Sequence, residues 1–159
     1  MTDFLTLSGR VSRHAGACPA PTILAALRES AIELCERGQI WRSSEDYIVI
    51  PKSIRDFDIS PPENTEIVSI DQVKYDGQII PPKSRSWLDK HWLSWENEEG
   101  NVPLYYYLTP VDDVFTVSIV PKPSETLKKI SCHLILKPSW DSSGMNGAIL
   151  SRYRKAIIA

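Results

Sequence analysis

The chain has 159 residues, of which 42% are hydrophobic and 24% charged, and its formal net charge is −2. This length is enough for one domain with a hydrophobic core, and we predict a single domain over residues 1–159. The weakly acidic balance lacks the basic footprint of a nucleic-acid-binding protein. Twelve prolines and only seven glycines favour short segments with stiff turns over a glycine-rich phosphate loop.

The cysteines and the apolar segments indicate the cellular compartment in which we expect the protein. Cys18, Cys35 and Cys132 are odd in number, and no two of them form a C-x-x-C pair. This spacing predicts buried thiols outside disulfides, in a reducing compartment. The N-terminus lacks the long apolar segment of a signal peptide, and no run approaches the roughly 18 apolar residues of a membrane span. We expect a soluble protein made and kept inside a cell, or packaged from one.

The N-terminal part predicts an arm followed by a helix. Residues 1–17 are mostly small and polar, which indicates an extended arm. A helix is predicted for residues 21–37, because Pro21 suits its first turn and Gly38 its end. Residues at helical spacing form one apolar stripe on it: Leu24, Leu27, Ala31, Leu34 and Cys35.

A β-rich part is predicted for residues 45–137, because the hydrophobic period changes to two after Trp41. Short strands are expected at residues 45–51 and 56–60. Asp76–Gly77 lies between two apolar runs, which is the strongest local signal of a hairpin.

Two more strands are expected around a turn at Asp112–Asp113, and a further one at residues 128–138. In the last of these, alternate residues are apolar and predict one buried face: Ile130, Cys132, Leu134 and Leu136. The strands are expected to form an antiparallel sheet or a small sandwich.

Two helical segments complete the pattern. Ser86, followed three residues later by Asp89, resembles a capping box and indicates a short helix before an acidic loop at residues 96–101. A C-terminal helix is predicted at residues 146–159. It ends in "AIIA" without a cap, which suggests a longer native chain. The fold class is therefore α+β, with N-terminal and C-terminal helices flanking the β-rich part.

Motifs for chemistry are absent from the sequence. It has no G-x-S-x-G elbow, no Walker loop and no G-x-G-x-x-G. His14 and Cys18 lack a second pair at metal-binding spacing, and Cys132 and His133 are adjacent on a strand, so they point to opposite faces. We predict no enzyme, no catalytic residue, no cofactor and no metal.

The tryptophans are the most conspicuous feature. Trp87, Trp92 and Trp95 fall within nine residues, in a stretch with charged neighbours. They could fill the core, form a protein interface or stack on sugar rings. We predict that Trp87, Trp92 and Trp95 belong partly to a protein–protein contact.

The segment "CPAPTILAALRESAIELCERGQIWR" resembles the start of the head-to-tail adaptors, or connectors, of tailed phages and prophages. Later segments agree in order with this family: "VKYDGQIIPP", "VPLYYYL", "VSIVPKPSETLKKISCHLILKPS" and "RYRKAI". Leu34 and Leu104 replace an aromatic residue and an arginine of the family pattern. The likeness covers residues 15 to 159, whereas family members generally continue through additional helices.

The resemblance implies a structural protein of the virion, located at the head–tail junction after synthesis in the host cytoplasm. Such adaptors form a ring beneath the portal protein, with twelve subunits expected to match a portal, and dock tail-tube or nozzle proteins. DNA passes through their channel without sequence-specific binding, and no membrane is involved. The alternative is a carbohydrate-binding or adhesion module that uses the tryptophan cluster. An enzyme whose site lacks a known motif is a third possibility.

Overall fold

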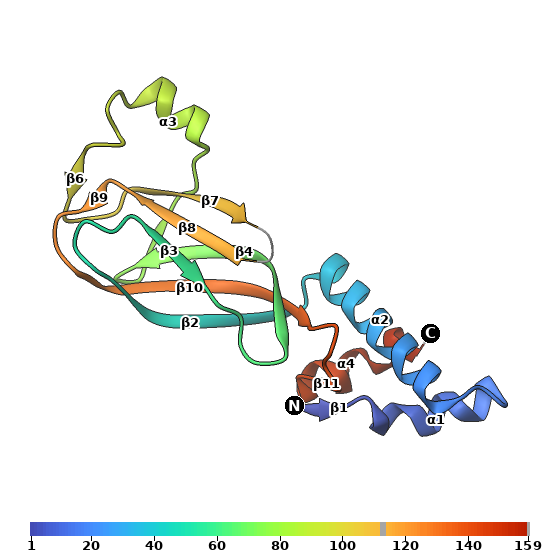
Figure 1. Cartoon of the computed structure of the whole chain (residues 1–159). Helices are drawn as coiled ribbons and strands as arrows, with labels where there is room; N and C mark the ends of the chain where they lie inside the picture. Colours follow the sequence, from blue (N-terminus) through green and yellow to red (C-terminus); the bar gives the residue numbers. More distant parts are fainter. Residues whose placement is uncertain (112–113, 159) are drawn as a thin grey trace. The chain divides into compact units, whose positions relative to one another are not determined.

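The computed structural model describes residues 1–111 and 114–158, apart from the side chains of residues 45–47 and 110. It has the predicted α+β class, with helices at both ends of the chain and strands between them (Figure 1). The helices are α1 (Leu5–Ala15), α2 (Ala20–Gly38), α3 (Arg85–His91) and α4 (Gly147–Ile158). The strands are β1 (Thr2–Asp3), β2 (Trp41–Ile50), β3 (Asp56–Ile59), β4 (Thr65–Tyr75), β5 (Gln78–Ile80), β6 (Glu99–Gly100), β7 (Tyr105–Val111), β8 (Val114–Val120), β9 (Lys122–Pro123), β10 (Leu127–Pro138) and β11 (Gly144–Met145).

The chain was predicted as one domain, and the structure groups it into two compact units. The helical unit comprises Met1–Ser43, Pro61–Ser69 and Ile135–Ala159. The β unit comprises Ser44–Ser60 and Ile70–Leu134. Each unit has its own buried apolar side chains, and each is described by itself below.

The prediction of an extended arm at residues 1–17 is wrong, because this segment contains β1 and α1. Its few apolar residues recur at helical spacing: Phe4 and Leu7 are buried, and Val11 is half-buried. The backbone N–H of Leu5 donates to Asp3 Oδ1 at 2.9 Å, which satisfies one of the free donors of the first turn. Tertiary burial therefore decides the conformation of a segment whose composition is mostly polar.

The predicted helix at residues 21–37 is confirmed as α2, but two details differ. The helix continues through Gly38, and Gln39 takes the left-handed C-cap position and donates its N–H to the Cys35 carbonyl oxygen at 3.0 Å. Leu24 and Leu34 are only half-buried. The buried stripe is displaced around the helix and consists of Ile23, Leu27, Ala31, Ile32 and Cys35.

An ionic triad connects three elements of the helical unit. Lys137 Nζ at the end of β10 lies 2.8 Å from Glu36 Oε1 of α2 and 3.3 Å from Glu66 Oε2 of β4. Burial by itself would lower the pKa of Lys137, but its hydrogen bonds to the two carboxylates outweigh burial and raise that pKa. The ammonium therefore stays charged and holds the three elements together.

The C-terminal helix is confirmed as α4, with its last predicted residue, 159, outside the described residues. Asn146 Oδ1 accepts the backbone N–H of Ala148 at 3.0 Å and so caps the first turn. Leu150 and Ile157 are buried on one side of the helix.

The β unit contains the predicted antiparallel strand pairs. β3, β8 and β7 form a three-stranded sheet in that order, and β5 is the edge of a four-stranded sheet with the order β2-β10-β4-β5. The chain that leaves β5 pairs with β7, because Lys83 N donates to the Tyr106 carbonyl oxygen at 2.8 Å. The short pair β6·β9 is parallel and falls partly in the predicted acidic loop.

The Asp76–Gly77 hairpin is confirmed. Both residues have positive φ, 48° and 79°, as a type I′ turn requires, and Tyr75 faces Gln78 across the turn. The predicted turn at Asp112–Asp113 lies outside the described residues. The alternation in β10 is also confirmed, since four alternate side chains are buried: Ile130, Cys132, Leu134 and Leu136.

The pairing of β1 with β11 anchors the N-terminus in the helical unit, and it depends on a glycine. Asp3 faces Gly144 in this pair, and a Cβ atom at Gly144 would collide with the backbone carbonyl of Thr2. We predict that Gly144→Ala lowers the free energy of unfolding by about 1–3 kcal/mol, because the backbone must shift to relieve the overlap. Chemical denaturation measures this loss.

Gly9→Ala is the matched control in the same unit. No atom lies within 4 Å of a Cβ at Gly9, which is in the middle of α1. This change is expected to stabilise the protein by up to about 1 kcal/mol, because alanine favours the helix. An equal effect of the two substitutions would contradict the β1·β11 pairing.

Candidate protein-binding site

The three clustered tryptophans lie on one structural element, the tryptophan lobe, which we define as residues 83–97. It contains α3 and the turns that follow. The predicted capping residue Ser86 is not the N-cap, because Ser84 has the extended backbone of an N-cap and its hydroxyl accepts the N–H of Trp87 at 3.2 Å. The predicted short helix is present, but its cap and its first residue both lie two residues earlier than predicted.

A small apolar core fixes the lobe. Leu88, Trp95 and Val120 form one buried cluster, and Trp95 is only 2% exposed. The Trp95 indole Nε1–H donates to Asp89 Oδ1 at 2.8 Å, so the buried ring keeps a partner for its polar atom. Its ring also meets that of Tyr107 edge-on, with 5.7 Å between centroids.

Trp87 is half-buried and covered by two polar side chains. Its ring stacks on the His91 ring at 4.5 Å, and Lys83 Nζ lies 4.3 Å from the ring centroid. The His91 Nδ1–H donates to the Trp87 carbonyl oxygen at 2.9 Å and so holds the stack in place. This arrangement combines a rigid aromatic ring with a cation over it.

The outer part of the lobe is apolar and exposed. Trp92 is half-buried and packs edge-on against Tyr105, with 6.3 Å between ring centroids. Leu93 follows it and is 84% exposed. Ser94 then takes a positive φ of 68°, which turns the chain back toward Trp95. A hollow of about 220 Å³ extends from Asp89 to Asn97 beside these residues.

One cation clamps the lobe to the strands of the β unit. Arg55 Nη2 donates to the carbonyl oxygens of Trp95 at 3.2 Å and Glu96 at 2.8 Å. Its guanidinium carbon lies 4.9 Å from the centroid of the Trp95 ring. Arg55 precedes β3, so this contact joins residues 40 positions apart in the sequence.

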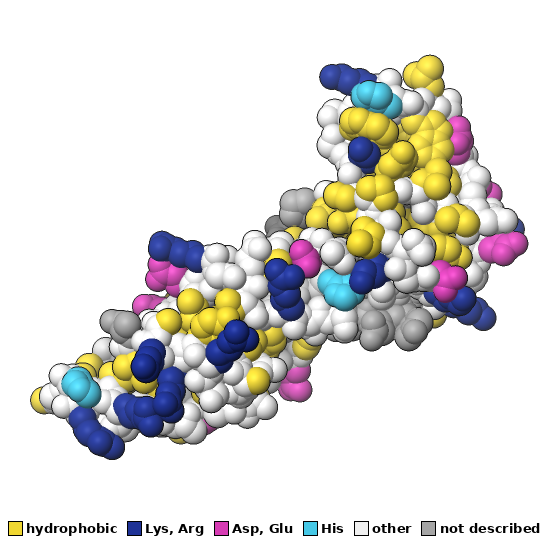
Figure 2. Space-filling view, turned by 180° about the vertical axis from the view of Figure 1, so that it is seen from behind, with side chains coloured by type: hydrophobic (Ala, Val, Ile, Leu, Met, Phe, Trp, Pro, Cys, Tyr) yellow, Lys and Arg dark blue, Asp and Glu magenta, His cyan; other side chains and the backbone are white. Residues whose placement is uncertain are grey.

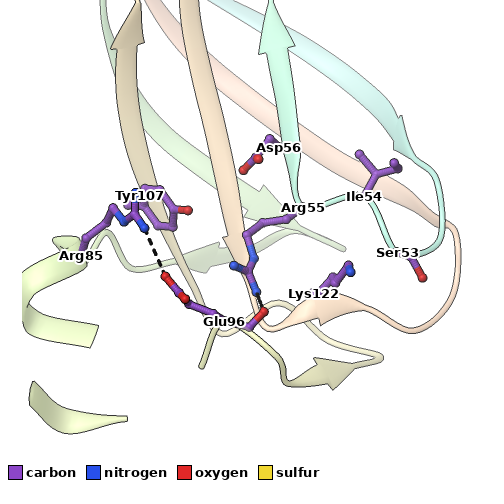
Figure 3. Close-up of a pocket in the computed structure, with 8 residues that line it drawn as sticks. All are labelled: Ser53, Ile54, Arg55, Asp56, Arg85, Glu96, Tyr107 and Lys122. Atoms are coloured by element: carbon purple, nitrogen blue, oxygen red, sulfur yellow. Dashed lines mark hydrogen bonds and ion pairs between the residues drawn. The ribbon is translucent and has the colours of Figure 1, made fainter. Parts of the chain in front are cut away.

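A polar pocket of about 590 Å³ lies at the foot of the lobe (Figure 3). Figure 3 shows Arg55 and Arg85 approaching Glu96 from different elements, and Arg85 Nη2 lies 3.1 Å from Glu96 Oε1. Lys122 and Tyr107 also line the pocket. Three cations and two carboxylates in one hollow suit polar contacts at the rim of an interface.

The structure brings the three predicted residues together but gives them different environments. Trp95 fills the core, whereas Trp87 and Trp92 remain partly accessible. Sequence reasoning did not single out Leu93 or Arg55. The hydrophobic pattern of the sequence does not indicate that Leu93 is exposed. The role of Arg55 depends on its contact with Trp95, which is distant in the sequence.

The three cysteines lie outside the tryptophan lobe. Cys35 and Cys132 are buried and Cys18 is half-buried, and none of the three is in a disulfide. Among the described residues, no group of three or more His, Cys, Asp or Glu side chains could hold a metal ion. Of the helices that the structure describes, none has the length and apolarity needed to cross a membrane.

Comparisons with known proteins give no match. No protein-family model matches the chain, and no curated protein matches it.

We predict that Arg55→Gln loosens the tryptophan lobe. The substitution removes two charge-assisted hydrogen bonds and the cation over Trp95, so the lobe should open more often without global unfolding. Amide hydrogen exchange in α3 is expected to become at least about tenfold faster. The control Lys52→Gln removes an exposed cation from the same loop and should leave this exchange unchanged. Unchanged exchange in Arg55→Gln would show that the clamp is dispensable.

The cysteines give a pH-dependent prediction. Burial, and secondarily the Glu36 carboxylate, raises the pKa of the Cys35 thiol from 9.0 to about 11. A thiol reagent at pH 8 should therefore modify Cys18 rapidly and Cys35 only after unfolding, and Cys18→Ser should abolish the rapid phase. In the unfolded chain the Cys35 thiol loses its proton at a lower pH than in the folded protein, and this ionisation favours the unfolded state. The free energy of unfolding should therefore fall as the pH rises from about 9 to about 11. Rapid labelling of Cys35 in the native protein would contradict this burial.

Proposed function

We propose that this chain is a structural head-to-tail adaptor of a tailed-phage virion, which forms a ring beneath the portal protein and docks tail or nozzle proteins. The observation that carries the proposal is the tryptophan lobe. It presents the exposed Leu93 and the partly accessible Trp92 on a base fixed by Leu88 and Trp95. A rigid aromatic and apolar projection of this kind is typical of protein-interface hot spots.

A ring subunit needs two different surfaces, because each copy contacts one neighbour on each side. The β unit offers a second apolar surface, formed by residues outside the tryptophan lobe. Ile79, Val102 and Leu104 are all at least half-exposed and line one hollow of about 430 Å³. Figure 2 shows hydrophobic side chains gathered over one face of the β unit. We infer that the lobe and this hollow are the two surfaces that neighbouring proteins contact.

The sugar-binding alternative receives less support from the same geometry. Sugar rings stack on open aromatic faces, but the Trp95 ring is buried and the Trp87 ring is covered by His91 and Lys83. These contacts favour a protein partner over a carbohydrate.

We predict that Leu93→Asp and Trp92→Ala fold normally but assemble poorly. Each removes apolar area from the proposed contact, and a hot-spot truncation can cost about 2 kcal/mol or more, repeated around the ring. Native mass spectrometry and negative-stain electron microscopy of the protein, alone and with its portal, measure the assembly. A thermal melt of each variant reports the fold.

Leu5→Asp is the matched control, because Leu5 is also an exposed leucine but lies in the first turn of α1, where an acidic residue is tolerated. This variant should assemble as the parent protein does. Normal incorporation of both lobe variants would remove the lobe from the interface. A parent protein that stays monomeric with the portal would overturn the adaptor proposal itself.

A further inference from the structure

Two helices of the helical unit carry only positive charge. Within their bounds α1 and α4 contain no aspartate and no glutamate. They contain five cationic residues, all exposed, which we call the basic helix pair: Arg10, Arg13, Arg152, Arg154 and Lys155. The local charge of +5 contrasts with the net charge of −2 of the whole chain.

The two helices form one surface. Val11, His14 and Ala15 of α1 line the same hollow as Ile158 of α4, so the C-terminal ends of the helices lie together. Figure 2 shows Lys and Arg side chains gathered over the helices of this unit, with acidic side chains toward the edge of the group. The cations of both helices therefore act on the same region of solvent.

The acids of the helical unit do not neutralise these five side chains. Between described residues of this unit, the ion pairs are Arg37–Glu33, Lys137–Glu36 and Lys137–Glu66. Glu33 lines a hollow with Ala156 of α4, and it is paired with Arg37 at 2.8 Å. No ion pair between described residues of this unit involves the basic helix pair, and its five side chains are exposed to solvent.

The chemistry between the cations favours phosphate over an acidic protein. Ser151 of α4 is exposed beside Arg152, whereas the hydroxyls of Ser8 and Ser12 donate to the carbonyl oxygens of Leu5 and Gly9 within α1. Hydroxyls and guanidinium groups are the side chains that contact the oxygens of a nucleic-acid backbone. A protein interface would instead need an apolar, aromatic centre depleted in charge.

We propose that the basic helix pair binds the phosphodiester backbone of double-stranded DNA without reading its sequence. This inference goes beyond the proposed adaptor role and does not depend on it. Each phosphate that a cation neutralises releases condensed counterions, so binding must weaken steeply with salt. Four such contacts give a slope of about −3.6 in log K against log salt concentration.

The test is fluorescence anisotropy of the full chain with short DNA duplexes of random sequence. The expected result is similar affinity for all sequences, and a loss of about 150-fold between 50 and 200 mM salt. Arg152→Gln with Lys155→Gln should reduce the steepness of the slope by about 1.8, and Arg10→Gln with Arg13→Gln should act in the same way through the other helix.

The matched control is Lys52→Gln with Lys128→Gln, which removes two exposed cations from the β unit and should leave the slope unchanged. An equal loss in this control would show that overall charge alone is responsible and would overturn the proposal. Absence of DNA binding at low salt would also overturn it. So would polyglutamate that competes as well as DNA, because the partner would then be an acidic protein.

Discussion

The pairing of β10 with a neighbour on each side is the constraint on which both units depend. β10 lies between β2 and β4 in the four-stranded sheet, and it supplies buried side chains to each unit. Leu134, Ile135 and Leu136 are buried in succession, which means that both faces of the strand are covered there. Lys137 follows at once and neutralises Glu36 and Glu66. A shift of β10 by one residue would expose apolar side chains and break this ionic triad together.

Elements with strong local patterns were predicted well from the sequence. The period of α2, the Asp76–Gly77 turn and the alternation in β10 each encode their structure within a few residues. The helix α1 was missed because its composition is polar and contains Gly9. Its conformation depends on the burial of Phe4 and Leu7 and on the pairing of the preceding strand, β1, with β11, more than 140 residues later. Local propensity is too weak to report such a distant contact.

The candidate site shows the same limit. The clustering of three tryptophans is visible in the sequence, but their burial is not. Arg55 donates to the backbone carbonyl oxygen of Trp95, and Asp89 accepts the indole N–H, so the buried residue keeps its polar partners. Arg55 comes from a different part of the chain. Leu93, two residues before Trp95, is left in solvent. Composition likewise concealed the basic helix pair, since a net charge sums over all surfaces and hides how charge is distributed among them.

The division of the chain has a consequence for its synthesis. The helical unit is assembled from three separate segments, whereas the β unit is complete once residue 134 has been made. On a ribosome, α1 and α2 emerge before the β unit, and β11 and α4 emerge after it. The helices α1 and α2 therefore wait with their apolar sides uncovered while the β unit forms, so the helical unit finishes folding after the β unit.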